Sequence, residues 1–181
     1  NNSLEQATAK LIAFTGSSAA AADVLAMVKA RAAATPFEFD EMASSAAGLA
    51  AVSKTTGESL EGLLGIAERL AASNPAEGLE GAAFALREAF SGDFVSLQDR
   101  FNIPKDLIKR IKEGGITVAE LDAELAAMGI TTDLVSGLAA TATGRISTFN
   151  DSVSELAGSL TEPVFEAFKT VLERIQPIID S

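Results

Sequence analysis

Residues 39–70 read FDEMASSAAGLAAVSKTTGESLEGLLGIAERL, and this stretch decides the fold class. Its apolar residues recur every three or four positions on both sides of a Thr-Gly pair, which is the spacing of one face of an α-helix. They are Phe39, Met42, Ala46 and Leu49 before the pair and Leu60, Leu63, Leu64, Ala67 and Leu70 after it. Glycine readily adopts the left-handed conformation that ends helices. The stretch therefore predicts consecutive helices separated by a turn at Gly57.

The same helical spacing continues toward both ends of the chain. Further helices are expected at about residues 4–14, 18–34, 75–90, 94–101, 107–111 and 117–128. The first of them carries one apolar face, made of Leu4, Ala7, Leu11 and Phe14. Gly16 and Thr35-Pro36 are expected to end the first helices, and Asn74-Pro75 reads as an N-cap followed by a proline at the first helical position. No run of alternating β-branched residues predicts a strand. The expected fold is all-α, with residues 1–143 as a compact bundle of short helices.

Residues 144–181 carry a different pattern, a heptad seam of apolar residues. Its positions are Ile146, Phe149, Val153, Leu156, Leu160, Val164, Phe168, Val171, Ile175 and Ile178. Two successive steps of four residues form a stutter, which locally relaxes supercoiling, and Pro163 beside it is expected to kink the helix. The pattern predicts a long, Pro-kinked helical arm after the bundle. Its stripe packs either on its own domain or against other chains, as an oligomer seam or an exit arm into a longer helical region.

Composition removes most classes of chemistry. The 181 residues include no Cys, His, Trp or Tyr, so no ordinary zinc site, haem site, thiol centre or Ser-His nucleophile is expected. With 14 Lys+Arg against 25 Asp+Glu, the net charge is -11, which disfavours binding to nucleic-acid phosphates. The longest charge-free stretches hold 12 residues, too few for a membrane span of about 20. We expect no enzyme activity, no cofactor and no metal.

Charged residues and glycines also gather locally. The carboxylate groups are Glu38, Asp40 and Glu41, and Glu120, Asp122 and Glu124; the basic group is Arg100, Lys105, Lys109, Arg110 and Lys112. Neighbouring positions face different ways on a helix, and acidic residues interleave the cations, so solvated helix surfaces are the favoured interpretation of both. The glycines within helical runs are Gly62, Gly65, Gly78 and Gly81. They are interpreted as points of close helix approach rather than as a nucleotide-binding loop.

Several short motifs occur in an order and spacing that resemble one known family. They are Phe14-Thr15-Gly16-Ser17, Thr35-Pro36-Phe37, the helix and glycine turn of residues 49–57, the segment FALREAFSGDFVSL of residues 84–97 with Gly92 at its turn, Phe101-Asn102-Ile103-Pro104, Thr143-Gly144-Arg145-Ile146-Ser147, and LTEPVFEAF of residues 160–168. Together they resemble the tape measure domain of the tail tape measure proteins of tailed bacteriophages. The family pattern has glycine where this chain has Asn102, which puts the local turn in question. In such a family these residues would be structural, with no active site to carry over.

The resemblance implies a function based on length. An α-helix rises 1.5 Å per residue, so an extended helical chain fixes a distance. A tape measure protein fills the tail tube lumen, sets tail length during assembly and takes part in genome ejection into the host. The implied partners are the tail tube protein, tail assembly chaperones, and tail tip or baseplate hub proteins. The chain is then expected to be part of a longer one and to form a homo-oligomer, for which a trimer is one option. It is expected to assemble in the host cytoplasm and to lie in the virion, in the tail tube lumen or at the tail tip.

Two other functional classes fit the same composition. One is a non-catalytic helical interaction module from another large assembly, which would share the lack of reactive groups. The other is an enzyme such as a cell-wall hydrolase carried by a virion protein, which would have to rely on an Asp/Glu pair. The length and helical content of the full gene product test the first class, and a peptidoglycan zymogram tests the second.

Overall fold

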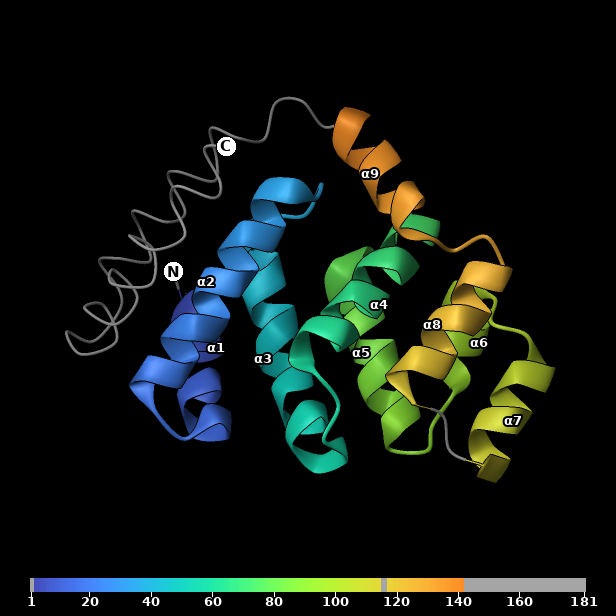
Figure 1. Ribbon diagram of the computed structural model, residues 1–181, viewed down its shortest axis with the longest axis horizontal. Coiled ribbons are helices and arrows are strands. Elements are labelled where there is room, and N and C mark those ends of the chain that lie inside the picture. Colours follow the sequence, from blue (N-terminus) through green and yellow to red (C-terminus); the bar gives the residue numbers. More distant parts are fainter. Residues whose placement is uncertain (1, 115–116, 142–181) are drawn as a thin grey trace.

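The computed structural model describes residues 2–114 and 117–141, and every regular element within these ranges is an α-helix (Figure 1). The helices are α1 (Asn2–Thr15), α2 (Ser18–Ala34), α3 (Phe39–Thr56), α4 (Leu60–Ser73), α5 (Gly78–Phe90), α6 (Val95–Phe101), α7 (Lys105–Gly114), α8 (Val118–Ala127) and α9 (Thr132–Thr141). The all-α prediction is confirmed for these residues. The predicted arm, with Gly144 and every seam position from Ile146 to Ile178, lies outside the described residues.

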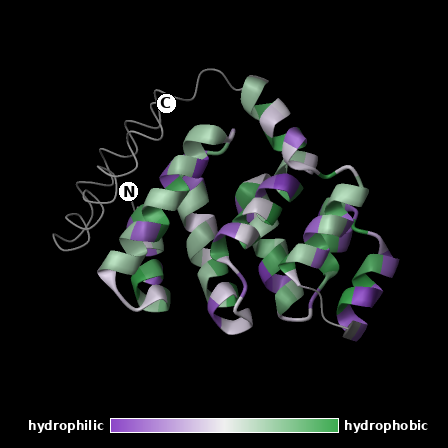
Figure 2. Ribbon diagram, viewed as in Figure 1, coloured by the Kyte–Doolittle hydropathy of each residue, from purple (hydrophilic) through white to green (hydrophobic). Residues whose placement is uncertain are grey.

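Helix α3 lies at the centre of the helical array. It contacts α1, α2, α4 and α5, and α4 in turn carries α8 and α9. Its buried residues include Phe39, Met42 and Leu49, but most of the others are alanines or serines, whose small side chains let neighbouring helices approach closely. Figure 2 shows this contrast, because α3 is pale over much of its length whereas α7 alternates between strongly hydrophilic and strongly hydrophobic residues. One continuous hydrophobic cluster runs from Leu4 in α1 to Ile130 before α9.

The helices end at the predicted glycines and before the predicted Thr-Pro pair. Gly16 and Gly57 have φ angles of 86° and 76°. Their backbone N–H groups each donate over 2.9 Å, to the carbonyl oxygens of Ile12 and Ser53. Helix α2 ends at Ala34, and Thr35 after it has an extended backbone, as expected before a proline. These turns are therefore local in origin and could be predicted from the sequence.

The predicted start of α5 at Asn74-Pro75 is wrong. Residues 74–77 form a turn, and the helix begins at Gly78, which has a φ of 65°. The amide of Leu79 donates to Oε1 of Glu41 over 2.8 Å, so a carboxylate from α3 caps this helix. Asn74 instead donates from its side chain to the carbonyl oxygen of Arg100 over 2.8 Å. A tertiary partner has replaced the local cap.

The turn at residues 101–104 takes the conformation that a glycine would take there. Asn102 has a φ of 54° and lies in the left-handed region, which asparagine tolerates better than most residues. The amide of Ile103 donates to the carbonyl oxygen of Leu97 over 3.1 Å, and the Ile103 side chain is buried. Asn102 therefore ends α6 in the left-handed conformation that glycine favours.

Candidate functional site

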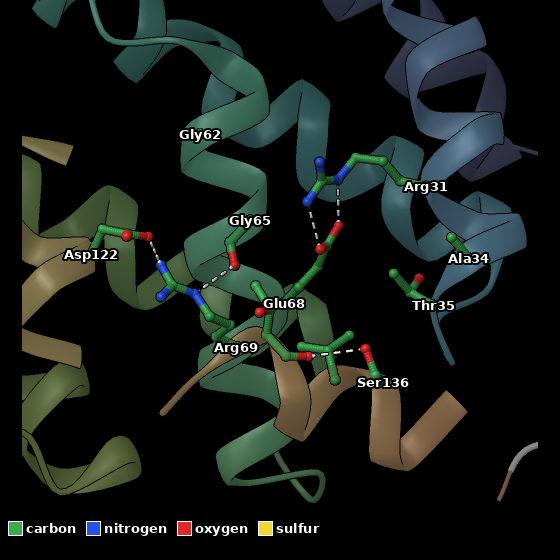
Figure 3. A pocket seen from close by; sticks show the side chains of 11 residues that line it. Arg31, Ala34, Thr35, Gly62, Gly65, Glu68, Arg69, Asp122 and Ser136 are labelled. Atoms are coloured by element: carbon green, nitrogen blue, oxygen red, sulfur yellow. Dashed lines mark hydrogen bonds and ion pairs between the residues drawn. The ribbon is translucent and has the colours of Figure 1, made fainter. Parts of the chain in front are cut away.

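A cavity of about 290 Å³ lies between α2, α4, α8 and α9, and ionic side chains line it (Figure 3). Helix α4 supplies two of these ionic groups, Glu68 and Arg69. Leu63, Leu64 and Leu70 of α4 are buried in the hydrophobic core. Glu68 and Arg69 are also buried, with only 4% and 5% of their surface exposed. Buried charges require partners, and both have one.

Glu68 is paired with Arg31 of α2 in a bidentate geometry. Nε of Arg31 donates to Oε1 and Nη2 donates to Oε2, both over 2.7 Å. Nη1 of Arg31 also reaches Oε1 of the exposed Glu61 at 3.3 Å. The hydrogen bonds that Arg31 donates to Glu68 raise the pKa of the Arg31 guanidinium, against the opposing effect of its burial. A Cβ at Gly65 would lie 3.3 Å from Nη2, so glycine gives this guanidinium the room it uses.

Arg69 points to the opposite side of α4, toward α8 (Figure 3). Its Nη2 group is bound to the Asp122 carboxylate, and its Nε donates to the Gly65 carbonyl oxygen over 3.4 Å. On the same side, a Cβ at Gly62 would lie 3.2 Å from Cγ1 of Val118. The prediction that glycines permit close approach is therefore confirmed at Gly62 and Gly65. It also holds at Gly78, where a Cβ would lie 3.2 Å from Oε1 of Glu41 on α3, and this glycine in addition supplies a left-handed turn.

Several of the acidic residues make specific contacts, although Glu120 and Asp122 remain exposed, as predicted. Glu41 caps α5, as described above, and Asp122 binds Arg69. Glu124 forms an ion pair with Nη1 of Arg110 on α7 at 2.6 Å. Glu120 completes a capping box at the start of α8, where its carboxylate accepts from the Thr117 amide over 2.9 Å. Thr117 is therefore the N-cap of α8.

The basic group does lie on the surface, but most of its members are paired. Lys109 is 3.8 Å from Glu113 and Arg100 is 3.1 Å from Glu77. The Lys112 ammonium lies 5.2 Å from the centre of the Phe94 ring, a cation–π contact. A second cavity of about 280 Å³ adjoins this contact, between the α5–α6 turn and α7. The interpretation as a helix surface holds for these cations.

The residues that carry the family resemblance lie at helix ends and do not gather in one site. Thr15, Gly16 and Gly92 lie at turns, with Gly92 at a φ of 96°. Phe37 is partly buried against the core, after Pro36. Ile103 is buried and Pro104 directly precedes α7. Among these residues, Thr35 lines the cavity beside α4.

Phe14 is predicted to lie on the apolar face of the first helix, but it is partly exposed. Leu4, Ala7 and Leu11 are at most 3% exposed, whereas Phe14 is 36% exposed. It lies near the end of α1, directly before Thr15 and the Gly16 turn, where no further helical turn extends the buried face. An exposed aromatic side chain in a motif residue is a surface feature that the periodicity did not reveal.

Ion pairs at this cavity hold the surrounding helices together. Its guanidinium groups are engaged by carboxylates. Over residues 2–114 and 117–141 there is no group of three or more Asp or Glu residues placed to hold a metal ion. No described helix is long and apolar enough to cross a membrane. The ion pairs at this cavity attach α2 and α8 to α4.

Sequence reasoning missed Arg31, Glu68 and Arg69. A signal was present, because Glu68 and Arg69 interrupt an otherwise apolar run, IAERLAA, and Arg31 lies in the alanine-rich helix α2. Charges within apolar helical segments are rarely buried unless they are paired. That rule indicates that each needs a partner, but the identity of the partner depends on the tertiary fold.

Acid is expected to weaken the attachment of α8. Hydrogen bonds from Thr117 lower the pKa of Glu120, and a hydrogen bond from Arg110 lowers the pKa of Glu124, relative to a usual value of 4.5. A carboxyl whose pKa is lower in the folded chain stabilises it above the unfolded pKa, and this stabilisation is lost as the pH falls through the folded pKa. Thermal unfolding between pH 7 and pH 3 should therefore show a loss below about pH 4.5 that is smaller in Glu124→Gln. Glu113→Gln, in the exposed pair with Lys109, is the control, and a wild-type profile for Glu124→Gln would contradict the prediction.

Comparison of the chain with protein-family models, with curated proteins and with solved structures gave no match. The geometry of α4 and its ionic partners is therefore interpreted from the residues themselves. The resemblance to tape measure proteins rests on the order of the motifs quoted from the sequence.

Proposed function

We propose that the chain is a structural, non-catalytic domain of a phage tail tape measure protein. The observation that supports this most is the turn at residues 101–104. The Asn102 position is where the motif departs from the family pattern, and its φ of 54° preserves the glycine-like helix end. Gly16, Thr35 and Gly92 likewise lie at helix boundaries, as the order of turns in the pattern requires.

In this proposal the described helices form a folded head rather than the extended tape. The short helices of residues 2–141 are connected by tight turns and share one core, so their length does not add linearly to a distance. The segment 144–181 would lead toward the helical tape. Tail tube subunits, tail assembly chaperones, and tip or baseplate hub proteins are the proposed partners, with the assembled protein in the tail of the virion and a role in genome ejection.

Tail lengths measured by electron microscopy test the proposal. The phage gene that encodes this chain is deleted and then supplied in trans as wild type or as Leu64→Asp, which places a charge in the buried core. We expect the wild type to restore tails of uniform length and Leu64→Asp to give few tails or tubes without a fixed length. Lys54→Gln, at an exposed position of α3, is the control. Uniform tails of unchanged length with Leu64→Asp, or in the deletion itself, would favour a helical module of another assembly.

The predicted seam has its own test, although it lies outside the described residues. Val153→Asp would place a charge in the proposed apolar interface between helices. We expect a smaller sedimentation coefficient or a lower melting temperature than wild type. A wild-type result in both measurements would mean that the stripe faces solvent, and the proposed homo-oligomer through this seam would be wrong.

A further inference from the structure

Helix α8 is attached to the rest of the fold by few apolar contacts. It buries two of its 10 residues, Leu121 and Leu125, whereas α4 buries nine of 14. In α9, Val135 is 6% exposed, but Leu134 beside it is 38% exposed, as is Met128 at the end of α8. Since apolar burial is the main source of stability, these helices are held less strongly than α4.

Charged groups make most of the specific contacts of α8 with other elements. Oε1 of Glu58, in the turn before α4, accepts from the Val118 amide over 3.2 Å. Asp122 binds Arg69 of α4, and Glu124 binds Arg110 of α7. We call these three carboxylates and their partners the charge latch. Each contact joins α8 to a different segment of the chain, so the charge latch fixes its position from several directions.

If α8 and α9 detached, the charged groups on the face of α4 that they cover would stay paired or become hydrated. The Arg69 side chain is 6% exposed, and separation from Asp122 would return it to water, which offsets the lost ion pair. The bidentate pair of Arg31 and Glu68 is complete without any group from α8 or α9. A cavity of about 290 Å³ lies between α4 and α9 on this face. Opening would therefore leave no buried charge on α4 without a partner.

We propose that α8 and α9 form one unit that detaches reversibly from α4 while α1–α5 stay folded, and that the charge latch sets how often it does so. The proposal does not depend on the tape measure assignment.

Hydrogen exchange of the full chain, followed by mass spectrometry, tests this directly. In the wild type we expect α8 and α9 to exchange together, faster than α3 and α4 but slower than an unfolded peptide. Asp122→Asn should speed exchange in both α8 and α9 by about 5- to 10-fold, with α1–α5 unchanged. Raising NaCl from 0.05 M to 1 M should have the same effect on the wild type, because salt screens the ion pairs.

Two further variants keep the test decisive. Glu113→Gln removes an exposed carboxylate of α7 outside the charge latch and should leave exchange unchanged. Arg69→Met combined with Asp122→Leu replaces the ion pair by apolar side chains, so it should slow exchange in α8 and α9 and reduce its salt dependence. The proposal is overturned if α8 and α9 exchange as slowly as α3 and α4, if they lack protection in the wild type, or if Asp122→Asn affects α8 without α9.

Discussion

Replacing Glu68 with alanine is expected to lower the free energy of unfolding by about 2–4 kcal/mol and the melting temperature by about 5–12 °C. The substitution leaves the Arg31 guanidinium beside an apolar surface without its bidentate partner. Breaking a fully buried pair costs more, but Arg31 is 24% exposed and can recover some hydration. Differential scanning calorimetry at pH 7 measures the change.

Glu61→Ala is the matched control for this prediction. Glu61 lies on the same helix and contacts the same arginine, but it is 65% exposed. An exposed ion pair contributes little, so the loss should be about 1 kcal/mol or less. A second variant, Arg31→Met with Glu68→Leu, should unfold close to the wild-type temperature, since well-packed apolar replacements for buried pairs are often neutral. Equal losses for Glu68→Ala and Glu61→Ala would show that burial of the pair is unimportant.

The features that could be predicted from the sequence are those whose cause lies within a few residues. Apolar spacing of three and four residues predicted α3 and α4, and the turns at Gly16 and Gly57 follow from the backbone freedom of glycine. The cap at Thr117 is also local, because its partner Glu120 lies three residues away. These features can be predicted from the sequence because the interacting groups are neighbours in any helical conformation.

The errors arose where a group from another helix replaced a local one. Asn74-Pro75 has the chemistry of a helix start, yet Glu41 provides the cap of α5 from 38 residues away. Asp122 belongs to a carboxylate group that looks solvated, yet it meets an arginine 53 residues away. Periodicity identifies the face on which such a residue lies but not which helix will cover it. The ionic cavity at α4 was missed for that reason.

Replacing Phe39 with alanine is expected to cost about 3–5 kcal/mol of stability, because a fully buried phenylalanine loses its transfer free energy and leaves a cavity behind. Phe39 is 1% exposed and begins α3, the central helix. The melting temperature should fall by about 8–15 °C, as measured by circular dichroism at 222 nm.

Phe37 and Phe14 provide the matched comparison, since the side chain removed is the same and only its surroundings differ. Phe37 is partly buried against the core, so Phe37→Ala should give an intermediate loss. Phe14 is 36% exposed, and Phe14→Ala should cost about 1 kcal/mol or less. A loss at Phe14 as large as that at Phe39 would mean that the end of α1 is buried in solution, against another copy or another segment. If Phe14→Ala is instead stable but fails to restore uniform tails, the exposed ring would be needed for a contact made during assembly, with a tail partner or another copy of the chain, rather than for folding.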